Sequence, residues 1–169
     1  MASLPPVIMS SLDVERLERL LTTPALAGSP AAARLLAEID RADIREPAEM
    51  PADVVTMNSK LTCREIQHGL QRELTLVYPD QANADRGCVS ILAPVGMALL
   101  GLRVGQTIEW PGPEGKPLTL EVTALAYQPE AAGDLHQQRV HARQRVILVR
   151  VPQPIATTRG NAPRATTTL

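Results

Sequence analysis

The residues whose side chains could carry out chemistry are few, and their spacing matches no catalytic or metal-binding pattern. The three histidines, His68, His136 and His141, lack H-E-x-x-H or comparable spacing. Cys63 and Cys88 are too few for a disulfide framework and lack metal-ligand spacing. The sequence shows neither a local Ser-His-Asp signature nor a glycine-rich phosphate loop. We therefore predict no catalytic residue, no metal and no cofactor, and we expect that the protein is not an enzyme.

Isolated polar groups have ordinary structural interpretations. Glu114 and Glu130 lie singly in predicted turns, where solvated surface is the default for a carboxylate. Cys63 and Cys88 lie in segments that resemble strands, so we expect them to be small buried apolar side chains in a reducing compartment.

Composition limits the possible functions further. Hydrophobic residues make up 44% of the 169 residues, enough to bury a core, and the net charge of −1 argues against a basic nucleic-acid binder. With one Trp, two Tyr and no Phe, the core must be aliphatic, and a stacking platform for single-stranded nucleic acid is hard to build. We find no signal peptide and no apolar run near the ~20 residues that span a bilayer. We therefore expect a cytoplasmic protein with no membrane contact. Monomer is the default, since no long heptad array is present.

Two amphipathic segments near the N-terminus are predicted to be helices. In residues 11–22 the apolar side chains recur at spacings of three and four, with Ser10 or Ser11 as the cap and Asp13 in the first turn, where the helix dipole favours negative charge. Residues 30–45 repeat the pattern after Ser29 as a cap and Pro30 at the first position. Two facing apolar stripes joined by a short loop predict an antiparallel helical hairpin, that is, a short coiled coil.

The loop between these helices is a candidate contact surface. Leu26, flanked by alanines, could insert into a groove of a partner. The alternative is a tip that folds back on its own helices. The candidate contact residues here are Pro24, Leu26 and Gly28.

The remaining chain changes to strand-like patterns after a linker at residues 47–52, where prolines end any helix. A first strand is predicted to start at Val54 and continue toward Ile66, with a turn at His68-Gly69. Further strands are expected over 74–78, 88–92, 106–110 and 118–127, with one short helix from Ala93 to Leu100. The predicted class is α+β: a helical hairpin over 8–46, then an antiparallel sheet with one short helix over 53–136.

The final segment, residues 137–169, is basic and predicted to be disordered beyond its first half. Its apolar run from Arg145 to Val151 could add a strand or form an aggregation-prone edge. The segment could touch nucleic acid or an acidic patch, or be an inert extension. Its six positive charges leave −7 on residues 1–136, and the arginines are Arg139, Arg143, Arg145, Arg150, Arg159 and Arg164.

Three motifs resemble one family. Residues 93–105, APVGMALLGLRVG, resemble the signature of the C-terminal domain of the Gre transcript-cleavage factors. Residues 50–59, MPADVVTMNS, and 127–134, YQPEAAGD, resemble the flanking motifs of the regulator of nucleoside diphosphate kinase family, which is related to the Gre factors. The resemblance covers about residues 8–136 and implies an FKBP-like β domain. It also implies binding to RNA polymerase near the secondary channel, which the helical hairpin approaches while the β domain holds the rim.

The resemblance also implies contact residues, with two departures from the Gre pattern. The segment matching the rim contact is Leu92, Ala93, Pro94 and Val95, where Leu92 replaces an acidic residue of the Gre factors. Acidic residues at the hairpin tip of those factors help hold a metal ion, whereas residues 22–30 contain no Asp or Glu, and the nearest acids are Glu18 and Glu38. Because Mg²⁺ is captured by carboxylates, this tip is predicted to dock without stimulating cleavage. We expect a competitor of Gre-type factors that affects nucleoside diphosphate kinase indirectly.

Two alternatives remain. The family name leaves open a direct protein regulator of nucleoside diphosphate kinase. FKBP-type folds are often peptidyl-prolyl isomerases, but those use an aromatic-lined pocket that one Trp and two Tyr can scarcely line. Nucleic acid is expected to be touched only indirectly or through the basic tail.

Overall fold

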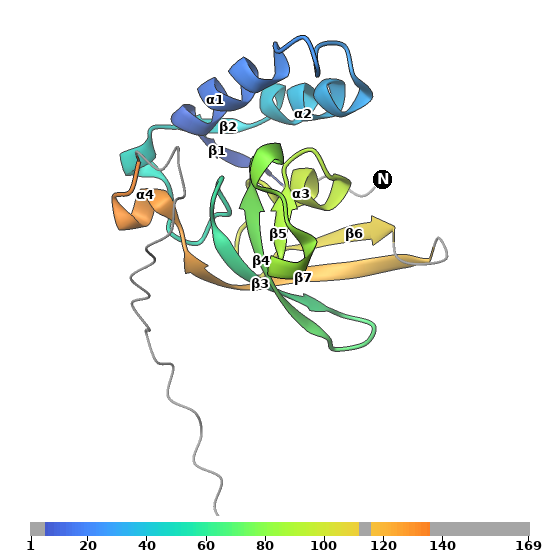
Figure 1. Ribbon diagram of the computed structural model, residues 1–169. Coiled ribbons are helices and arrows are strands. Elements are labelled where there is room, and N and C mark those ends of the chain that lie inside the picture. The colour runs from blue at the N-terminus through green and yellow to red at the C-terminus, as the bar shows by residue number, and fades with distance from the viewer. Residues whose placement is uncertain (1–5, 112–115, 136–169) are drawn as a thin grey trace, which may run out of the picture. The chain divides into compact units, whose positions relative to one another are not determined.

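This computed structural model describes residues 6–111 and 116–135, but not the side chains of residues 110 and 111. Helices and strands make up most of the described chain. Figure 1 shows α1 and α2 side by side above a curled sheet. The predicted α+β class is confirmed. In chain order the helices and strands are β1 (Ile8–Ser10), α1 (Ser11–Leu21), α2 (Pro30–Asp40), β2 (Asp43–Arg45), β3 (Lys60–Glu65), β4 (Gln71–Val77), β5 (Cys88–Ser90), α3 (Pro94–Leu99), β6 (Thr107–Pro111), β7 (Pro117–Tyr127) and α4 (Pro129–Ala132).

The two N-terminal helices form because each has one apolar stripe that the rest of the protein covers. Leu17 of α1 and Leu35 of α2 are both 0% exposed. Ser29 caps α2 as predicted, since its hydroxyl accepts the Ala32 N–H at 3.1 Å, whereas the Ser10 hydroxyl makes no capping bond to α1. Helices in the described part of the chain are too short and too polar to cross a bilayer.

The second helix is shorter than its apolar pattern predicts. Helix α2 ends at Asp40, and residues 43–45 form β2, which pairs in parallel with β1. The Asp43 N–H donates to the Val7 carbonyl at 2.9 Å, so a tertiary hydrogen bond draws the backbone out of the helix. The predicted helix over 30–45 is therefore wrong in its last turn, because strand pairing outweighs local propensity there.

The large sheet has five strands in the order β5-β4-β3-β7-β6. All pairs are antiparallel except β4–β5, which is parallel, so the prediction of a purely antiparallel sheet is wrong. Strand β5 runs parallel because residues 78–87 return the chain along the sheet through two 3₁₀ turns, Pro79–Gln81 and Ala84–Arg86. The predicted strand over 88–92 is cut to three residues, and α4 is a second short helix that the pattern did not predict.

Residues 54–59 do not begin the first strand of the sheet, as the apolar pattern had suggested. Val54 makes an isolated bridge with Arg103, and the regular strand starts at Lys60. Asn58 has a φ of 63°, a left-handed conformation that Asn tolerates better than most residues. Its N–H donates to the Leu76 carbonyl at 2.7 Å. This turn presents the backbone N–H of Met57 to Asp13 of α1.

One hydrophobic core connects the N-terminal helices with the sheet. A single buried cluster contains Leu17 and Leu35 together with Leu61 and Val122. The core is aliphatic, as composition predicts. Cys63 lies in this core, and burial raises the pKa of its thiol to about 11, which keeps it protonated at neutral pH. Cys88 is only half-buried.

We predict that Gly96→Ala destabilises the protein although alanine is the better helix former. A Cβ at position 96 of α3 would lie 2.1 Å from the Ser90 carbonyl oxygen, so α3 and β5 would have to separate. The expected loss in free energy of unfolding is about 1–3 kcal/mol, measured by urea denaturation. Gly69→Ala is the matched control, because its Cβ would meet nothing within 4 Å and only its φ of +67° is strained. A Gly96→Ala protein as stable as the wild type would contradict the close packing.

Candidate functional site

The loop between α1 and α2 is held by its own hydrogen bonds. The Leu26 N–H donates to the Thr23 carbonyl at 3.0 Å, and the Ser29 N–H donates to the Leu26 carbonyl at 2.9 Å. Pro24 and Gly28 are exposed, but Leu26 is half-buried. The loop thus presents mainly its backbone and small side chains, with only part of the Leu26 side chain available for contact.

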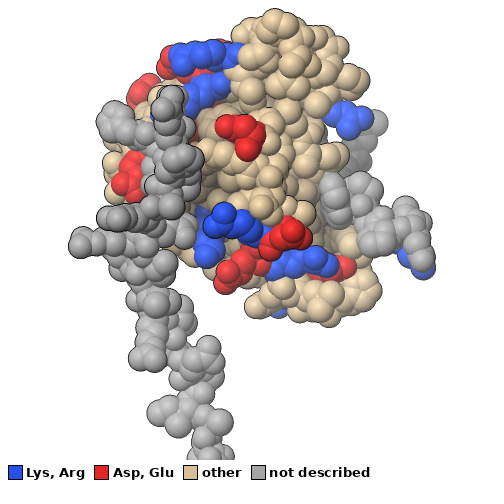
Figure 2. Space-filling model, in the orientation of Figure 1, with Lys and Arg blue, Asp and Glu red and all other residues tan. Residues whose placement is uncertain are grey.

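This loop carries no ionisable side chain. Figure 2 shows the loop end of the helix pair as an uncharged surface on the face drawn. The nearest carboxylates lie on the helices: Glu18 is exposed on α1, and Glu38 on α2 forms an ion pair with Arg41. Among the described residues, no three His, Cys, Asp or Glu side chains are placed to hold a metal ion.

The segment of residues 92–95 lies at the start of α3. The Leu92 N–H donates to the Ser90 hydroxyl at 3.1 Å, and Pro94 occupies the first turn of the helix, where its missing N–H costs nothing. Leu92 and Val95 are partly buried and pack on the core. Pro94 is therefore the exposed member of the predicted contact set, and Ala93 is half-buried beside it.

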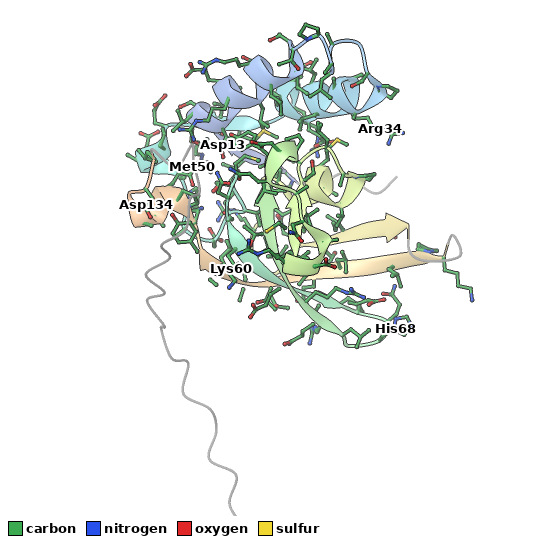
Figure 3. All side chains as sticks on the ribbon, in the orientation of Figure 1. Asp13, Arg34, Met50, Lys60, His68 and Asp134 are labelled. Carbon is green, nitrogen blue, oxygen red and sulfur yellow. The ribbon has the colours of Figure 1, made fainter. Side chains whose placement is uncertain are left out.

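A third feature, which sequence reasoning missed, is a polar junction where α1 meets the sheet. Asp13 projects from α1 toward the sheet (Figure 3) and is only 3% exposed. Its Oδ2 accepts the Met57 N–H at 3.0 Å. Asp13 precedes Leu17 by four residues, so it lies on the buried face of α1. The spacing of four from Leu17 indicates that Asp13 is buried, whereas its place in the first turn of α1 explained it by the helix dipole alone.

Glu130 completes the junction from α4. The Thr56 hydroxyl donates to Glu130 Oε2 at 2.6 Å, and the Thr56 N–H donates to the Ser59 hydroxyl at 3.0 Å. The prediction that Glu130 is an isolated solvated carboxylate is wrong, because the turn at residues 54–59 lies against α4. Gln128, just before α4, donates from Nε2 to the Pro51 and Val54 carbonyls at 2.8 and 2.6 Å.

Two ionisable groups at the junction, Asp13 and Tyr78, have raised pKa values. Burial, and after it the neighbouring Glu130 carboxylate, raise the pKa of Asp13 to about 7, against the lowering effects of the Met57 N–H and Arg16. Burial also raises the pKa of the Tyr78 phenol, and the Asp13 carboxylate adds to that rise. A cavity of about 10 Å³ lies here, room for about one water. Its lining includes Leu12, Asp13, Arg16, Met57, Asn58, Pro129, Glu130, Asp134 and Leu135.

Comparison with known proteins defines the class of the sheet-forming part first. The model for the C-terminal domain of transcription elongation factors GreA and GreB matches residues 50–127, and the Rnk N-terminus model matches residues 5–44. Transcription elongation factor GreA of Solidesulfovibrio magneticus is 32% identical over 97 residues, which are 57% of this chain and 58% of that protein. The sheet-forming part is thus a Gre-type C-terminal domain.

Similarity over nearly the whole of one relative then fixes the family. The regulator of nucleoside diphosphate kinase of Escherichia coli strain K12 is 52% identical over 132 residues, covering 78% of this chain and 97% of that protein. This chain belongs to the regulator of nucleoside diphosphate kinase family, which confirms the resemblance carried by the three motifs. A solved structure of a prokaryotic transcription elongation factor GreA/GreB from Nitrosomonas europaea matches with a TM-score of 0.63 and 45% identity, over 73% of this chain and 99% of that one.

We predict that Thr56→Val, which keeps the shape of the side chain but removes its hydroxyl, weakens the junction. The Thr56 hydroxyl also lies 3.0 Å from the Ser59 hydroxyl. Glu130 and Ser59 would therefore each lose a hydrogen-bond partner in a largely buried place, at a cost of about 1–3 kcal/mol in the free energy of unfolding. Urea denaturation measures the loss. Thr107→Val on exposed β6 is the matched control and should change stability by less than ~0.5 kcal/mol. Equal effects of the two substitutions would refute the assigned role of the Thr56 hydroxyl.

Proposed function

We propose that this protein binds RNA polymerase near its secondary channel and competes there with Gre-type cleavage factors without stimulating transcript cleavage. Its relatives by sequence are a regulator of nucleoside diphosphate kinase and transcription elongation factors, which supports a role in transcription rather than a chemical reaction. The Gre-type C-terminal domain supports the polymerase as the partner.

The proposed docking uses both parts of the molecule. The α1–α2 pair acts as the short hairpin that approaches the channel, with the loop of residues 22–29 leading. At 11 residues each, the helices are about 16 Å long. The β domain, which we assign to the FKBP-like class, holds the rim through the start of α3, where Pro94 is exposed. The Asp13–Met57 hydrogen bond keeps the helix pair fixed against the domain during docking.

The observation that carries the proposal is the absence of acid from the leading loop. Residues 22–29 contain no Asp or Glu, and their backbone is fixed by the Thr23 and Leu26 hydrogen bonds. Capture of Mg²⁺ requires oxygen ligands that are usually carboxylates. Glu38 is engaged by Arg41, and Glu18 stands about one turn behind the loop. The protein is thus suited to occupy a site without delivering a metal ion.

Isomerase chemistry is disfavoured by the two tyrosines. Tyr78 is largely buried beside Asp13, and the Tyr127 hydroxyl donates to the Asp134 carboxylate at 2.7 Å. One Trp and two Tyr in the whole sequence can scarcely line an aromatic proline pocket. We regard an effect on nucleoside diphosphate kinase as indirect, through transcription. Direct regulation of that kinase is the second candidate, because the 52% identical relative carries that name.

We predict that the full-length protein lowers cleavage by a Gre-type factor in a backtracked elongation complex. The expected inhibition rises with protein concentration and is overcome by excess factor, because both compete for one site. Transcript length analysis on a gel measures it. Unchanged cleavage at saturating protein would refute competition, and increased cleavage by this protein alone would refute the argument from the acid-free loop.

We predict that Pro94→Glu weakens binding to core RNA polymerase at least ~10-fold, a loss typical of a contact in the centre of an interface. Gln71→Glu, which adds the same charge on the exposed start of β4, is the control and should bind normally. Affinity is measured with purified core polymerase and, in parallel, with purified nucleoside diphosphate kinase. Binding to the kinase and not to the polymerase would overturn the proposal in favour of the second candidate.

A further inference from the structure

Two carboxyl groups from distant parts of the chain meet at the polar junction. Asp13 comes from α1 and Glu130 from α4, and their partners are consecutive residues. The Thr56 hydroxyl donates to Glu130 at 2.6 Å, and the Met57 N–H donates to Asp13 at 3.0 Å. Since neighbouring Cα atoms are only about 3.8 Å apart, the two carboxyl groups are held close together. Both also line the small cavity between α1 and α4.

The ionisable groups around this pair come from α1, from the ends of β4 and β7, and from the segment after α4. At the end of β7, burial raises the pKa of the Tyr127 phenol, and Asp134, to which its hydroxyl donates, and the nearby Glu130 carboxylate add to that rise. Helix α1 adds the Arg16 guanidinium, which donates from Nη2 to the Leu135 carbonyl at 2.8 Å. Tyr78 enters from the end of β4, and Asp134 lines the cavity beyond α4. The turn of residues 54–59 contains no ionisable side chain. One arginine thus faces two carboxyl groups and a third nearby, in a place where Asp13 is almost fully removed from water.

We propose that Asp13 and Glu130 form a pH-sensitive latch, which holds α1 against the turn of residues 54–59 while Asp13 is protonated and loosens when Asp13 ionises. The physical cause is that two like charges in a poorly solvated space repel each other and lose hydration. The latch lies between the helix pair and the sheet, so it controls how firmly the helix pair is held. This inference does not depend on what the protein binds.

The direction of the pH effect follows from the raised pKa of Asp13. In the closed form its pKa is about 7, whereas an unfolded or opened Asp titrates near 3.8. The closed form is therefore favoured below the lower value and loses this advantage as pH rises through the higher one. Between pH 6 and pH 8 the opening equilibrium constant should rise about tenfold, and it should level off above that range.

The test combines two measurements on the full-length protein. Carbon-13 NMR of the Asp13 carboxyl should show a titration midpoint near 7. Hydrogen exchange of the Met57 amide, corrected for the intrinsic pH dependence of exchange, should show the ~10-fold rise in opening between pH 6 and pH 8. The Met57 amide reports opening of the junction itself, because its N–H donates directly to Asp13.

Variants separate the latch from a merely structural contact. Asp13→Asn keeps an acceptor for the Met57 N–H but cannot ionise, so the pH-dependent rise should disappear. Glu130→Gln should lower the Asp13 midpoint, which loss of packing alone would not do. Glu18→Gln, exposed on the same helix, is the control and should titrate like the wild type.

Three results would overturn the proposal: a wild-type Asp13 midpoint below 5, a pH-dependent rise that persists in Asp13→Asn, or an Asp13 midpoint that Glu130→Gln leaves unchanged. The wild-type titration and the Glu130→Gln titration decide the matter even if Asp13→Asn does not fold.

Discussion

The structure depends on a hydrogen bond between a buried carboxyl group and a backbone amide, Asp13 to Met57. Around it, the apolar face of α1 packs on the sheet, so that Leu17 and Leu61 belong to one core. A pair of 11-residue helices is marginal alone, because short helices gain most of their stability from tertiary packing. The sheet therefore stabilises the helix pair, and the polar junction fixes the position of α1 on it.

Much of the fold could be predicted from the spacing of apolar residues and from the residues that cap helices. Apolar spacing gave α1 to within one residue, Ser29 marked the start of α2, and alternation gave β7. Three features could not be predicted because they depend on pairing with residues elsewhere in the chain: the end of α2 at Asp40, the parallel β4–β5 pair and the turn before β3. In each case a hydrogen bond to a residue distant in sequence overrides the local preference.

The candidate site likewise has features that the sequence predicts and features that only the fold brings together. The acid-free loop was accessible from sequence, because charge alone defines it. Pro94 was one of four contact residues implied by the family resemblance, and only the structure shows that it is the exposed one. The meeting of Asp13 with Glu130 was not accessible from sequence, because 117 positions separate the two residues and only the fold brings Thr56 and Met57 between them. The Arg145–Val151 run lies outside the described residues, so its two possible roles, an added strand or an aggregation-prone edge, stay predictions.

The pairing of β1 with β2 closes the base of the N-terminal helical segment, so that the segment is a separate unit that can vary in length. Strand β1 immediately precedes α1, and β2 follows α2 by two residues, so the two ends of the helical segment are joined side by side (Figure 1). Ile8 is in turn tied to Gly101 by a backbone hydrogen bond of 3.3 Å, and a side chain on Gly101 would collide with Val7. With its base closed in this way, the pair of helices can lengthen or shorten by whole turns without moving the point at which it joins the sheet. Helix pairs of different lengths can thus be joined to the same sheet.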